Sequence, residues 1–533
     1  MLWITAALHV DGLTKRSLLL LLVVLAMSSE NVYGARILLA SPQMASHAVM
    51  QTPIGKRLAQ QGHEVYIAIG SRYHDPESLE EMGLRTITYH VPSDIPFGRN
   101  DDVAKLIAEL VFGPDFHALS FAKAMSALIS RDCEFMLSDE KFAEALRALK
   151  LDVALVDALV INPCVLLLPY SLNVRFVSLA NFYLPWTIRM PALPSFLRIP
   201  SPVVTGSEPN LWNSLINTVF YLGAHWRLPS AVWNSTLLDR YSPGDVTWNE
   251  LILKSELFFV VDDHHLGLPL PAFPNIVPVP GITARPPKPL PDKLAKLATE
   301  SHDGIILVTF GSAAMYFPEP VVVKFLEAFS GVKQTVIAKL SVPKGVSLPK
   351  NVHVFHWLPQ NDILGHQQTK LFITHCGSNG QHEALYHGVP MLGFPLFADQ
   401  PSNCERARAK GFGLTMNIHE FSSEELFNNI QEMLGNKSYG DNIKWCSAIL
   451  RDEPMLGPKK VAHWIEHVIK YGSAHLRSPA MDLPLYRFLM LDVLAIIFVV
   501  TFIVTDVICV STIAVTRIIR RKLLYHPSPK KFQ

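Results

Sequence analysis

The chain has 533 residues, which is enough for two ordinary domains and further attached segments. Its 47 Lys and Arg residues nearly balance its 46 Asp and Glu residues, so the charge gives no sign of a nucleic-acid-binding protein. Hydrophobic residues make up 49% of the chain and charged residues only 17%, and this apolar excess comes from one segment near each end.

The N-terminal apolar segment is SLLLLLVVLAM, which follows Lys15 and Arg16 and precedes small residues around Gly34 and Ala35. A basic start, a short apolar run and small residues predict a cleavable signal peptide over residues 1–34. The alternative is an uncleaved anchor, although the run is too short to cross a bilayer unaided.

From Arg36 onward, short apolar runs alternate with helical stretches. RILLASP predicts a strand, residues 47–61 predict a helix, and HEVYIAIG predicts a second strand. The alternation recurs at LDVALVDALV, at a helix from Cys164, and at VRFVSLA. This pattern predicts a parallel sheet covered by helices on both faces, within an N-terminal domain over residues 35–280.

Residues 181–207 interrupt the pattern, because they are rich in proline and aromatic residues and too apolar for an ordinary connection. They either line a pocket for an apolar ligand, touch a membrane surface, or pack beneath the domain.

Six prolines in VPVPGITARPPKPLPDK predict a stiff linker, which we place at residues 281–298. Beyond it, the apolar runs GIILVTFGS, QTVIAKL, NVHVFHWLP and KLFITHCG restart the α/β pattern over residues 299–475. The sequence therefore predicts an α/β protein with two doubly wound, Rossmann-like domains facing a cleft. Ligands are expected at the carboxyl ends of the strands.

The C-terminal apolar segment, residues 493–516, contains a single acid, Asp506, and is long enough to predict a transmembrane helix. Residues 476–492 form a juxtamembrane stretch before it. Basic residues follow at once and place the tail, residues 517–533, in the cytosol: Arg517, Arg520, Arg521 and Lys522. A buried core helix is the alternative.

The two ends together predict a type I membrane protein of the endoplasmic reticulum whose domains face the lumen. Lys530 and Lys531 in the ending KKFQ resemble a dilysine retrieval signal. Sequons at Asn234 and Asn436 are compatible with glycosylation in that compartment. The six cysteines show no close metal-type pairs and no disulfide scaffold, although one lumenal bridge could exist.

Residues 372–403, FITHCGSNGQHEALYHGVPMLGFPLFADQPSN, concentrate His, Cys and small residues as a metal or an anion site would. His382 and His387 are five positions apart, roughly 140° around a helix, so both rings cannot bind one ion from a regular helix. His375 and Cys376 are adjacent on a strand end and point to opposite sides. We therefore predict no metal site in this stretch.

An anion site fits the same stretch better. KLFITHC predicts a strand, GSNG a turn, and QHEALYHG a helix that ends at Gly388. The free N–H groups and the dipole at such a helix start favour bound anions. Gly377 permits close approach of the backbone, while Ser378 and Asn379 add side-chain donors.

The block from HWLPQNDILGH through FADQPSN resembles the signature of the UDP-glycosyltransferase family, in particular its membrane-bound UDP-glucuronosyltransferase branch. The resemblance covers nearly the whole chain, including the signal peptide, the anchor and the dilysine ending. It implies the GT-B fold, with the acceptor bound by the N-terminal domain and the UDP-sugar by the C-terminal domain.

The resemblance also implies roles for donor-site residues. Trp357 would stack on the uracil, Gln360 would bond nearby, and Glu383 would accept the ribose hydroxyls. Asp399 and Gln400 would bind hydroxyls of the sugar. The diphosphate site would consist of Ser312, His375, Gly377, Ser378, Asn379 and Gly380. Taken singly, Trp357 could instead be a core residue and Asp399 a helix cap.

Sugar transfer to a hydroxyl needs a base near the acceptor proton. His47 falls where a helix begins after the first strand, a position at which a lone histidine is more often structural. The resemblance implies that His47, in the pair Ser46-His47, is the catalytic base and that Asp157, before a Pro-Cys pair, is its partner. A carboxylate beside an imidazole fixes its tautomer and stabilises the imidazolium. The competing acid, Asp152, is expected only to start a strand.

The mechanism implied by the resemblance is a single inverting displacement. The helix start after His375 would stabilise the leaving diphosphate, so no metal and no other cofactor is expected.

Three positions at two places in the chain depart from the branch. Cys376 stands where most members have glycine. Ala338 and Lys339 stand where the branch typically has Trp-Arg, which keeps a charge but loses the planar fork of arginine.

Branch resemblance favours glucuronic acid as the transferred sugar, with glucose as the alternative, and a small lipophilic acceptor that bears a hydroxyl. A catalytically silent membrane partner that binds UDP-sugar is an alternative from a different class. The presence of both His47 and Asp157 argues against that alternative. Homo- or hetero-oligomers remain open, and no nucleic-acid partner is expected.

Overall fold

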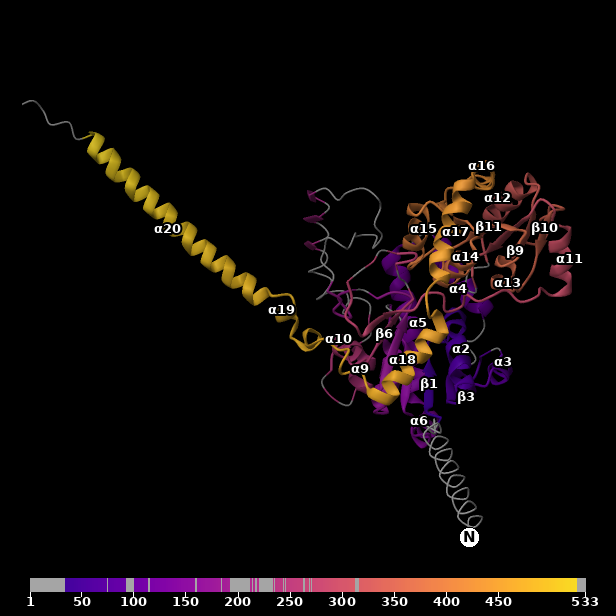
Figure 1. The fold of residues 1–533 in the computed structure, drawn as a ribbon, viewed down its shortest axis with the longest axis horizontal. Coiled ribbons are helices and arrows are strands. Elements are labelled where there is room, and N and C mark those ends of the chain that lie inside the picture. Colours follow the sequence, from indigo (N-terminus) through magenta and orange to yellow (C-terminus); the bar gives the residue numbers. More distant parts are fainter. Residues whose placement is uncertain are drawn as a thin grey trace, which may run out of the picture. The chain divides into compact units, whose positions relative to one another are not determined.

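The computed structural model of the chain describes residues 34–524, except 74, 93–99, 114–115, 159–160, 184, 192–210, 213, 216–217, 220–232, 234, 243, 245, 262–263, 268, 270 and 312–315 (Figure 1). Nearly all of the predicted signal peptide, the sequon at Asn234, Ser312 and the dilysine ending therefore lie outside the described residues. The chain divides into two compact units, Met1–Leu476 and Arg477–Gln533.

Within the described residues, the first sheet of the larger unit has seven strands in the order β3-β2-β1-β4-β5-β6-β7, all parallel. Its inner strands consist almost entirely of buried apolar residues, as expected for a parallel sheet covered on both faces. The strands are β1 (Arg36–Ala40), β2 (Glu64–Gly70), β3 (Arg85–Tyr89), β4 (Val153–Asp157), β5 (Phe176–Ala180), β6 (Phe258–Val260) and β7 (Ile276–Pro278).

The helices that connect these strands include two long ones near the cleft, α2 and α5. The helix predicted at residues 47–61 begins two residues earlier than expected, at Ala45. The helices of this region are α2 (Ala45–Gln60), α3 (Pro76–Glu81), α4 (Asn100–Phe112), α5 (Ala118–Ser138), α6 (Glu140–Ala148), η1 (Cys164–Leu166), α7 (Leu167–Ser171), α9 (Ser235–Tyr241) and α10 (Trp248–Leu253).

The second sheet, counted over the described residues, has six parallel strands in the order β10-β9-β8-β11-β12-β13. Its strands are β8 (Ile305–Thr309), β9 (Thr335–Lys339), β10 (Val352–Val354), β11 (Thr369–Thr374), β12 (Met391–Gly393) and β13 (Gly413–Thr415). Its helices are α11 (Asp292–Glu300), α12 (Glu319–Ser330), α13 (Gln360–Leu364), α14 (Ser378–His387), α15 (Gln400–Ala409), α16 (Ser423–Gly435) and α17 (Lys437–Arg451).

Strand order reverses once in each sheet, between β1 and β4 in the first and between β8 and β11 in the second. Ligands of doubly wound sheets bind outside the carboxyl ends of the strands at such reversals. The two reversals therefore mark the residues that follow β1, β4, β8 and β11 as the candidates for a site.

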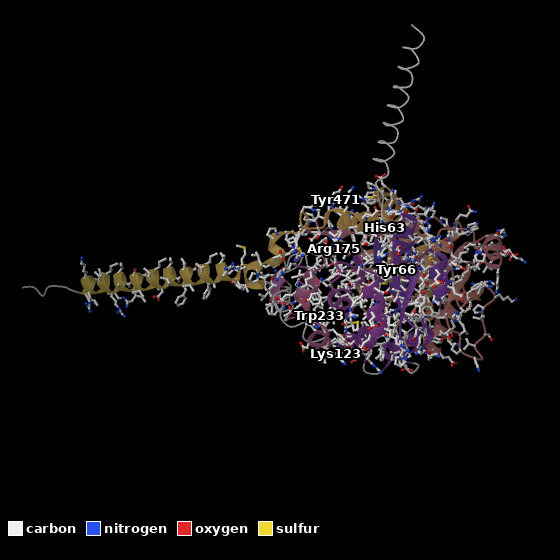
Figure 2. The ribbon with its side chains drawn as sticks, turned by 90° about the horizontal axis from the view of Figure 1, so that it is seen from below. His63, Tyr66, Lys123, Arg175, Trp233 and Tyr471 are labelled. Atoms are coloured by element: carbon white, nitrogen blue, oxygen red, sulfur yellow. A yellow bond between two sulfur atoms is a disulfide. The ribbon has the colours of Figure 1, made fainter. Side chains whose placement is uncertain are left out.

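Helix α18 (Gly457–Tyr471) follows the second sheet in sequence but packs against α2 of the first. Val461, Ile465 and Val468 lie in one buried cluster with Ile37 and Ile54. His63, labelled in Figure 2 on the same flank as Tyr471, donates from Nε2 to Glu466 of this helix at 3.1 Å. Part of the range predicted as the C-terminal domain thus completes the core around the first sheet.

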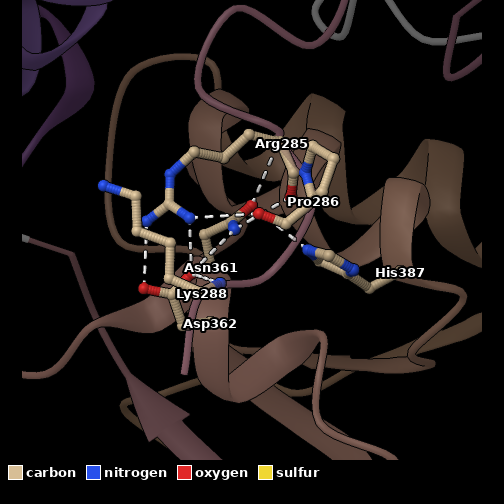
Figure 3. Close-up of polar contacts among 6 residues, drawn as sticks. All are labelled: Arg285, Pro286, Lys288, Asn361, Asp362 and His387. Atoms are coloured by element: carbon tan, nitrogen blue, oxygen red, sulfur yellow. Dashed lines mark hydrogen bonds and ion pairs between the residues drawn. The ribbon is translucent and has the colours of Figure 1, made fainter. Parts of the chain in front are cut away.

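The linker is tied to the second sheet by a polar network around α13 (Figure 3). Arg285 donates through two guanidinium nitrogens to Asp362, at 2.5 and 3.0 Å, and the backbone N–H of Lys288 donates to the same carboxylate at 2.9 Å. Asn361 exchanges two hydrogen bonds with the backbone of Arg285, and its Oδ1 also accepts from His387 at 3.2 Å. Burial alone would raise the pKa of Asp362, but these donors outweigh it and lower the pKa.

The smaller unit contains η3 (Pro479–Asp482), α19 (Leu485–Phe488) and the 34-residue helix α20 (Leu491–Leu524). Among the described residues, α20 is the one helix long and apolar enough to cross a membrane, judged by length and composition. It contains the whole predicted span, residues 493–516, and its apolar side chains are exposed on all sides. A helix that is apolar all round is typical of a membrane span.

Candidate active site

A cleft of about 1350 Å³ is lined by residues from both sheets of the larger unit. From the first sheet come the loop after β1, the start of α2, helix α5 and the residues after β5. From the second come the linker and the residues that follow β8, β9, β10, β11 and β12. The cleft thus lies at the strand ends that both topologies mark.

His47 lines this cleft and is in direct contact with the buried Asp157. Strands β1 and β4 are neighbours, so the helix start after β1 lies next to the last residue of β4. Nδ1 of His47 lies 2.6 Å from Oδ2 of Asp157, and the two residues are 7% and 1% exposed. With Asp157 ionised, Nδ1–H donates to the carboxylate, and Nε2 remains as the acceptor.

The charge of His47 depends on two carboxylates. Burial lowers the pKa of His47, but the charge and hydrogen bond of Asp157, with a smaller contribution from Asp399 across the cleft, outweigh it and raise the pKa. Asp152, the competing acid, accepts from the backbone N–H of Arg36 at 2.8 Å at the start of β4. Its structural role is the expected one.

Helix α14 begins at the cleft, directly after β11. Its N-cap is Gly377, and Ser378, Asn379 and Gly380 all line the cleft, so the free N–H groups of its first turn are positioned for an anion. The helix ends at Gly388, as the sequence predicted, and the structure shows this glycine in the left-handed conformation. Asn379 also donates to the backbone oxygen of Ser46 at 3.4 Å, which connects the two sides of the cleft.

His375 is enclosed between two glycines. A Cβ atom on Gly311, whose φ is +79°, would lie 2.8 Å from the ring, and one on Gly377 would lie 2.5 Å from Nε2. The imidazole ring of His375 therefore requires glycine at position 377. The sequence had suggested only the approach of a ligand.

His375 is neutral at physiological pH. Burial and the nearby charge of Lys339 lower its pKa to about 4. Its Nδ1 is buried and makes no hydrogen bond to any described residue. A neutral imidazole held in this way can donate one hydrogen bond to an anion in the cleft.

Lys339 lines the cleft at the end of β9, where the resemblance had led us to expect arginine. Its Nζ donates to the backbone oxygen of Gly311 at 3.0 Å and lies 5.2 Å from the centre of the Trp357 ring. The sequence marked this position only as a departure, but the structure places its charge beside His375. Its position at the carboxyl end of a strand was the signal that could have identified it.

Trp357, Gln360 and Glu383 lie together on the same side of the cleft. The indole of Trp357 is 63% exposed, so it is not a core residue. Gln360 accepts from the hydroxyl of Thr309 and donates to Glu383 at 2.8 Å. Burial raises the pKa of Glu383 to about 7, although the bond from Gln360 opposes the shift.

Asp399 and Gln400 follow β12 and also line the cleft. Asp399 accepts from Nδ2 of Asn403 at 2.7 Å, and burial raises its pKa against that bond. Oε1 of Gln400 accepts from the backbone N–H groups of Leu396 and Phe397 at 2.9 and 3.1 Å. Only the NH₂ group of Gln400 therefore remains for a ligand.

The first-sheet side of the cleft is largely apolar. Phe121 on α5 stacks on Phe397 from the second sheet, with ring centres 4.7 Å apart. Phe182, from the start of the interrupting segment, lines the cleft, whereas residues 192–207 of that segment lie outside the described residues. Other apolar lining residues are Phe116, Met125, Ile129 and Ile161.

In the described part of the chain, one group of side chains has the spacing for a metal ion. Ligand atoms of His264, His265 and Glu453 lie within 4.8 Å of one another, away from the cleft. His265 already pairs with Glu453 at 3.7 Å, and Nζ of Lys410 lies 3.4 Å from the backbone oxygen of His264. In the stretch 372–403, His382 and His387 bond to different partners, Ser378 and Asn361.

The structure contains two disulfides among the described residues, Cys133–Cys164 and Cys376–Cys404. The sequence had left room for one bridge and had not paired any cysteines. The sequon residue Asn436 is exposed, and its side chain caps α17 by accepting from the N–H of Ser438 at 3.1 Å.

Residues 36–524 match the family model described as UDP-glucoronosyl and UDP-glucosyl transferase. UDP-glucuronosyltransferase 2C1 of Oryctolagus cuniculus is 32% identical over 411 residues, which cover 74% of this chain and 78% of the relative. UDP-glucuronosyltransferase 2B17 of Rattus norvegicus is 30% identical over 485 residues, covering 85% of this chain and 88% of the relative.

Solved structures share the fold at lower identity. The spinosyn forosaminyltransferase SpnP aligns with a TM-score of 0.57 at 18% identity, over 82% of this chain and 100% of that one. The calicheamicin glycosyltransferase CalG4 aligns with a TM-score of 0.55 at 17% identity, over 82% of this chain and 99% of that one. Together with the two parallel sheets, these neighbours confirm the predicted GT-B fold.

Proposed function

Because this chain belongs to the UDP-glucuronosyl and UDP-glucosyl transferase family, we propose that it transfers glucuronic acid from UDP-glucuronate to a hydroxyl of a small lipophilic acceptor. The observation that carries the proposal is that His47, which is paired with Asp157, and the start of α14 line one cleft. A base for the acceptor and an anion site for the donor then lie on opposite sides of the reacting carbon.

His47 removes the acceptor proton in this proposal. Its Nε2 accepts the proton as the acceptor oxygen attacks the anomeric carbon. Asp157, bonded to Nδ1, holds the required tautomer and stabilises the imidazolium that forms. The apolar side chains around Phe121 and Phe182 suit a lipophilic acceptor.

The diphosphate leaves from the opposite side in a single inverting step. The N–H groups at the start of α14, the imidazole of His375 and the ammonium group of Lys339 supply donors and positive charge for it. Trp357 is exposed to stack on the uracil, and Glu383 is placed to accept the ribose hydroxyls. Asp399 and the NH₂ group of Gln400 bind the sugar.

We place this activity in the endoplasmic reticulum lumen, on a type I membrane protein anchored by α20. The basic residues at the end of α20 support a cytosolic C-terminus. The two disulfides suit an oxidising compartment. Protease protection in sealed microsomes tests this placement, since cleavage of the larger unit by external protease would contradict it.

The activity is tested in microsomes that contain the expressed chain. UDP-glucuronate and UDP-glucose are offered separately with a panel of small phenols, and a His47→Ala variant serves as the control. We expect a glucuronide from the wild type and none from the variant.

Each other result has a defined meaning. Product from UDP-glucose alone keeps the mechanism but replaces the donor, because Asp399 and Gln400 fit the hydroxyls of either sugar. Saturable UDP binding without turnover from either donor favours the silent membrane partner.

A further inference from the structure

The Cys376–Cys404 disulfide joins the two segments that form the second-sheet side of the cleft. Cys376 lies between His375 and Gly377, in the turn from β11 to α14. Cys404 lies on α15, one helical turn after Gln400. Their Cα atoms are 5.4 Å apart, and both residues are only 1% exposed.

The backbone at Cys376 has an unusual conformation. Its φ is +63°, in the left-handed region that costs a residue with a side chain about 1–2 kcal/mol. Glycine, which has no Cβ atom, adopts that conformation without strain. A side chain here therefore needs a compensating interaction, and the bridge to α15 supplies one.

A second connection runs parallel to the bridge. Nδ2 of Asn403 donates to the backbone oxygen of Cys376 at 3.0 Å and to Oδ2 of Asp399 at 2.7 Å. The backbone oxygen of Asn403 accepts from Gln381 of α14 at 2.8 Å. The segment from His375 into α14 and the start of α15 are thus held together by one covalent bond and two hydrogen bonds, and the third hydrogen bond ties Asp399 to Asn403 within the α15 segment.

The strand beneath is shaped to fit the bridge. A Cβ atom on Gly393, the last residue of β12, would lie 2.2 Å from the sulfur of Cys404 and 2.4 Å from that of Cys376. Any side chain at this position would collide with both sulfurs. The disulfide is therefore built into the packing of the sheet end.

We propose that the Cys376–Cys404 disulfide is a positioning element of the donor site. By fixing the backbone of Cys376, the bridge fixes the position of His375, which would contact the diphosphate. It does so relative to Asp399 and Gln400, which would contact the sugar. This inference rests on the proposed donor-binding role of the cleft. It predicts that loss of the bridge weakens donor binding and leaves acceptor binding unchanged.

The test compares full-length variants in membranes. In Cys404→Ala, we expect the donor KM and the dissociation constant of UDP to rise by roughly tenfold, because small displacements of binding groups are costly. The acceptor KM should stay as in the wild type. In the double variant Cys376→Gly/Cys404→Ala, glycine adopts the left-handed conformation freely, so part of the lost UDP affinity should return.

Two controls separate positioning from general damage. Cys446→Ser removes a free, buried cysteine outside the cleft and should leave UDP affinity unchanged. Thermal melting without ligand identifies any variant that is simply unfolded. If Cys404→Ala is unfolded, the UDP affinity of the double variant tests the positioning role instead.

The proposal is overturned by any of three results. The first is that peptide mass spectrometry of the unreduced wild type detects no Cys376–Cys404 bridge. The second is that Cys404→Ala binds UDP as tightly as the wild type, and the third is that the double variant regains no UDP affinity. UDP titration needs neither the transferred sugar nor an acceptor. A wild type that binds UDP but makes no glucuronide would therefore contradict the proposed function alone.

Discussion

The protonation of His47 sets the pH at which the proposed base is active. Asp157 raises the pKa of His47, so more acid solution protonates the imidazole and removes its ability to accept a proton. In the wild type, kcat/KM should rise with pH through this pKa and then level off.

Asp157→Asn keeps the shape of the residue but removes its charge. The pKa of His47 should fall, which moves the rising limb of the profile to lower pH. The plateau should drop by about 100-fold or more, since the imidazolium loses its partner. The profile is measured at saturating donor, and an unmoved limb would show that another group limits the rate.

Glu383 titrates near neutral pH, because burial raises its pKa to about 7. It is mostly protonated at pH 6 and mostly ionised at pH 8, and a carboxylate is the better acceptor for ribose hydroxyls. UDP affinity should therefore increase from pH 6 to pH 8. Calorimetric titration at both values tests this, with Glu383→Gln expected to reduce the pH dependence to the part that comes from the terminal phosphate of UDP.

The sequence predicted which single residues lie at the cleft where a local pattern marked them. His47 after the first strand, and His375 to Glu383 at the turn into a helix, were all located by strand ends and the family block. The use of Oε1 of Gln400 by two backbone N–H groups could not be predicted in the same way. It depends on the path of residues 396–397, which no local pattern determines.

At the level of elements, α14 and the turn before it should be intolerant of small substitutions. Gly377→Ala would put a Cβ atom 2.5 Å from Nε2 of His375, so the ring must move away from the anion site. We expect a loss of UDP affinity on the order of tenfold. The matched control is Gly440→Ala, because a Cβ atom at that position on α17 would meet no atom within 4 Å beyond its own stretch of helix. Equal affinity of the two variants would contradict the role given to the glycine.

Strands were predicted more reliably than the contacts of distant elements. Runs such as RILLA and TKLFIT are apolar, rich in branched residues and bounded by turns, so their pattern alone indicates buried strands. Neither cysteine pair could be assigned, because 31 and 28 residues separate the partners and only the folded sheet brings them together.

At the level of the whole molecule, α18 connects the end of the second sheet to the core of the first. Ile465 is fully buried in that core, so Ile465→Ala should lower the free energy of unfolding by about 2–5 kcal/mol. Exposed His463 on the same helix is the control, and its change to alanine should have little effect.

Limited proteolysis distinguishes this assignment from a helix that serves only the second sheet. In Ile465→Ala, new cleavage sites should appear first in α2 and the neighbouring strands. First cleavage in α16 or α17 would contradict the packing described here.

The return of α18 to α2 also has a consequence for biosynthesis. The ribosome completes β1 and α2 early, but the residues that cover their apolar side, Val461 to Val468, are among the last of the larger unit to be made. Until then the nascent first sheet exposes an uncovered apolar flank, and such surfaces attract chaperones or other unfolded chains. A stop codon or frameshift shortly before residue 457 would therefore leave the core of the first sheet uncovered, although all seven of its described strands have already been translated.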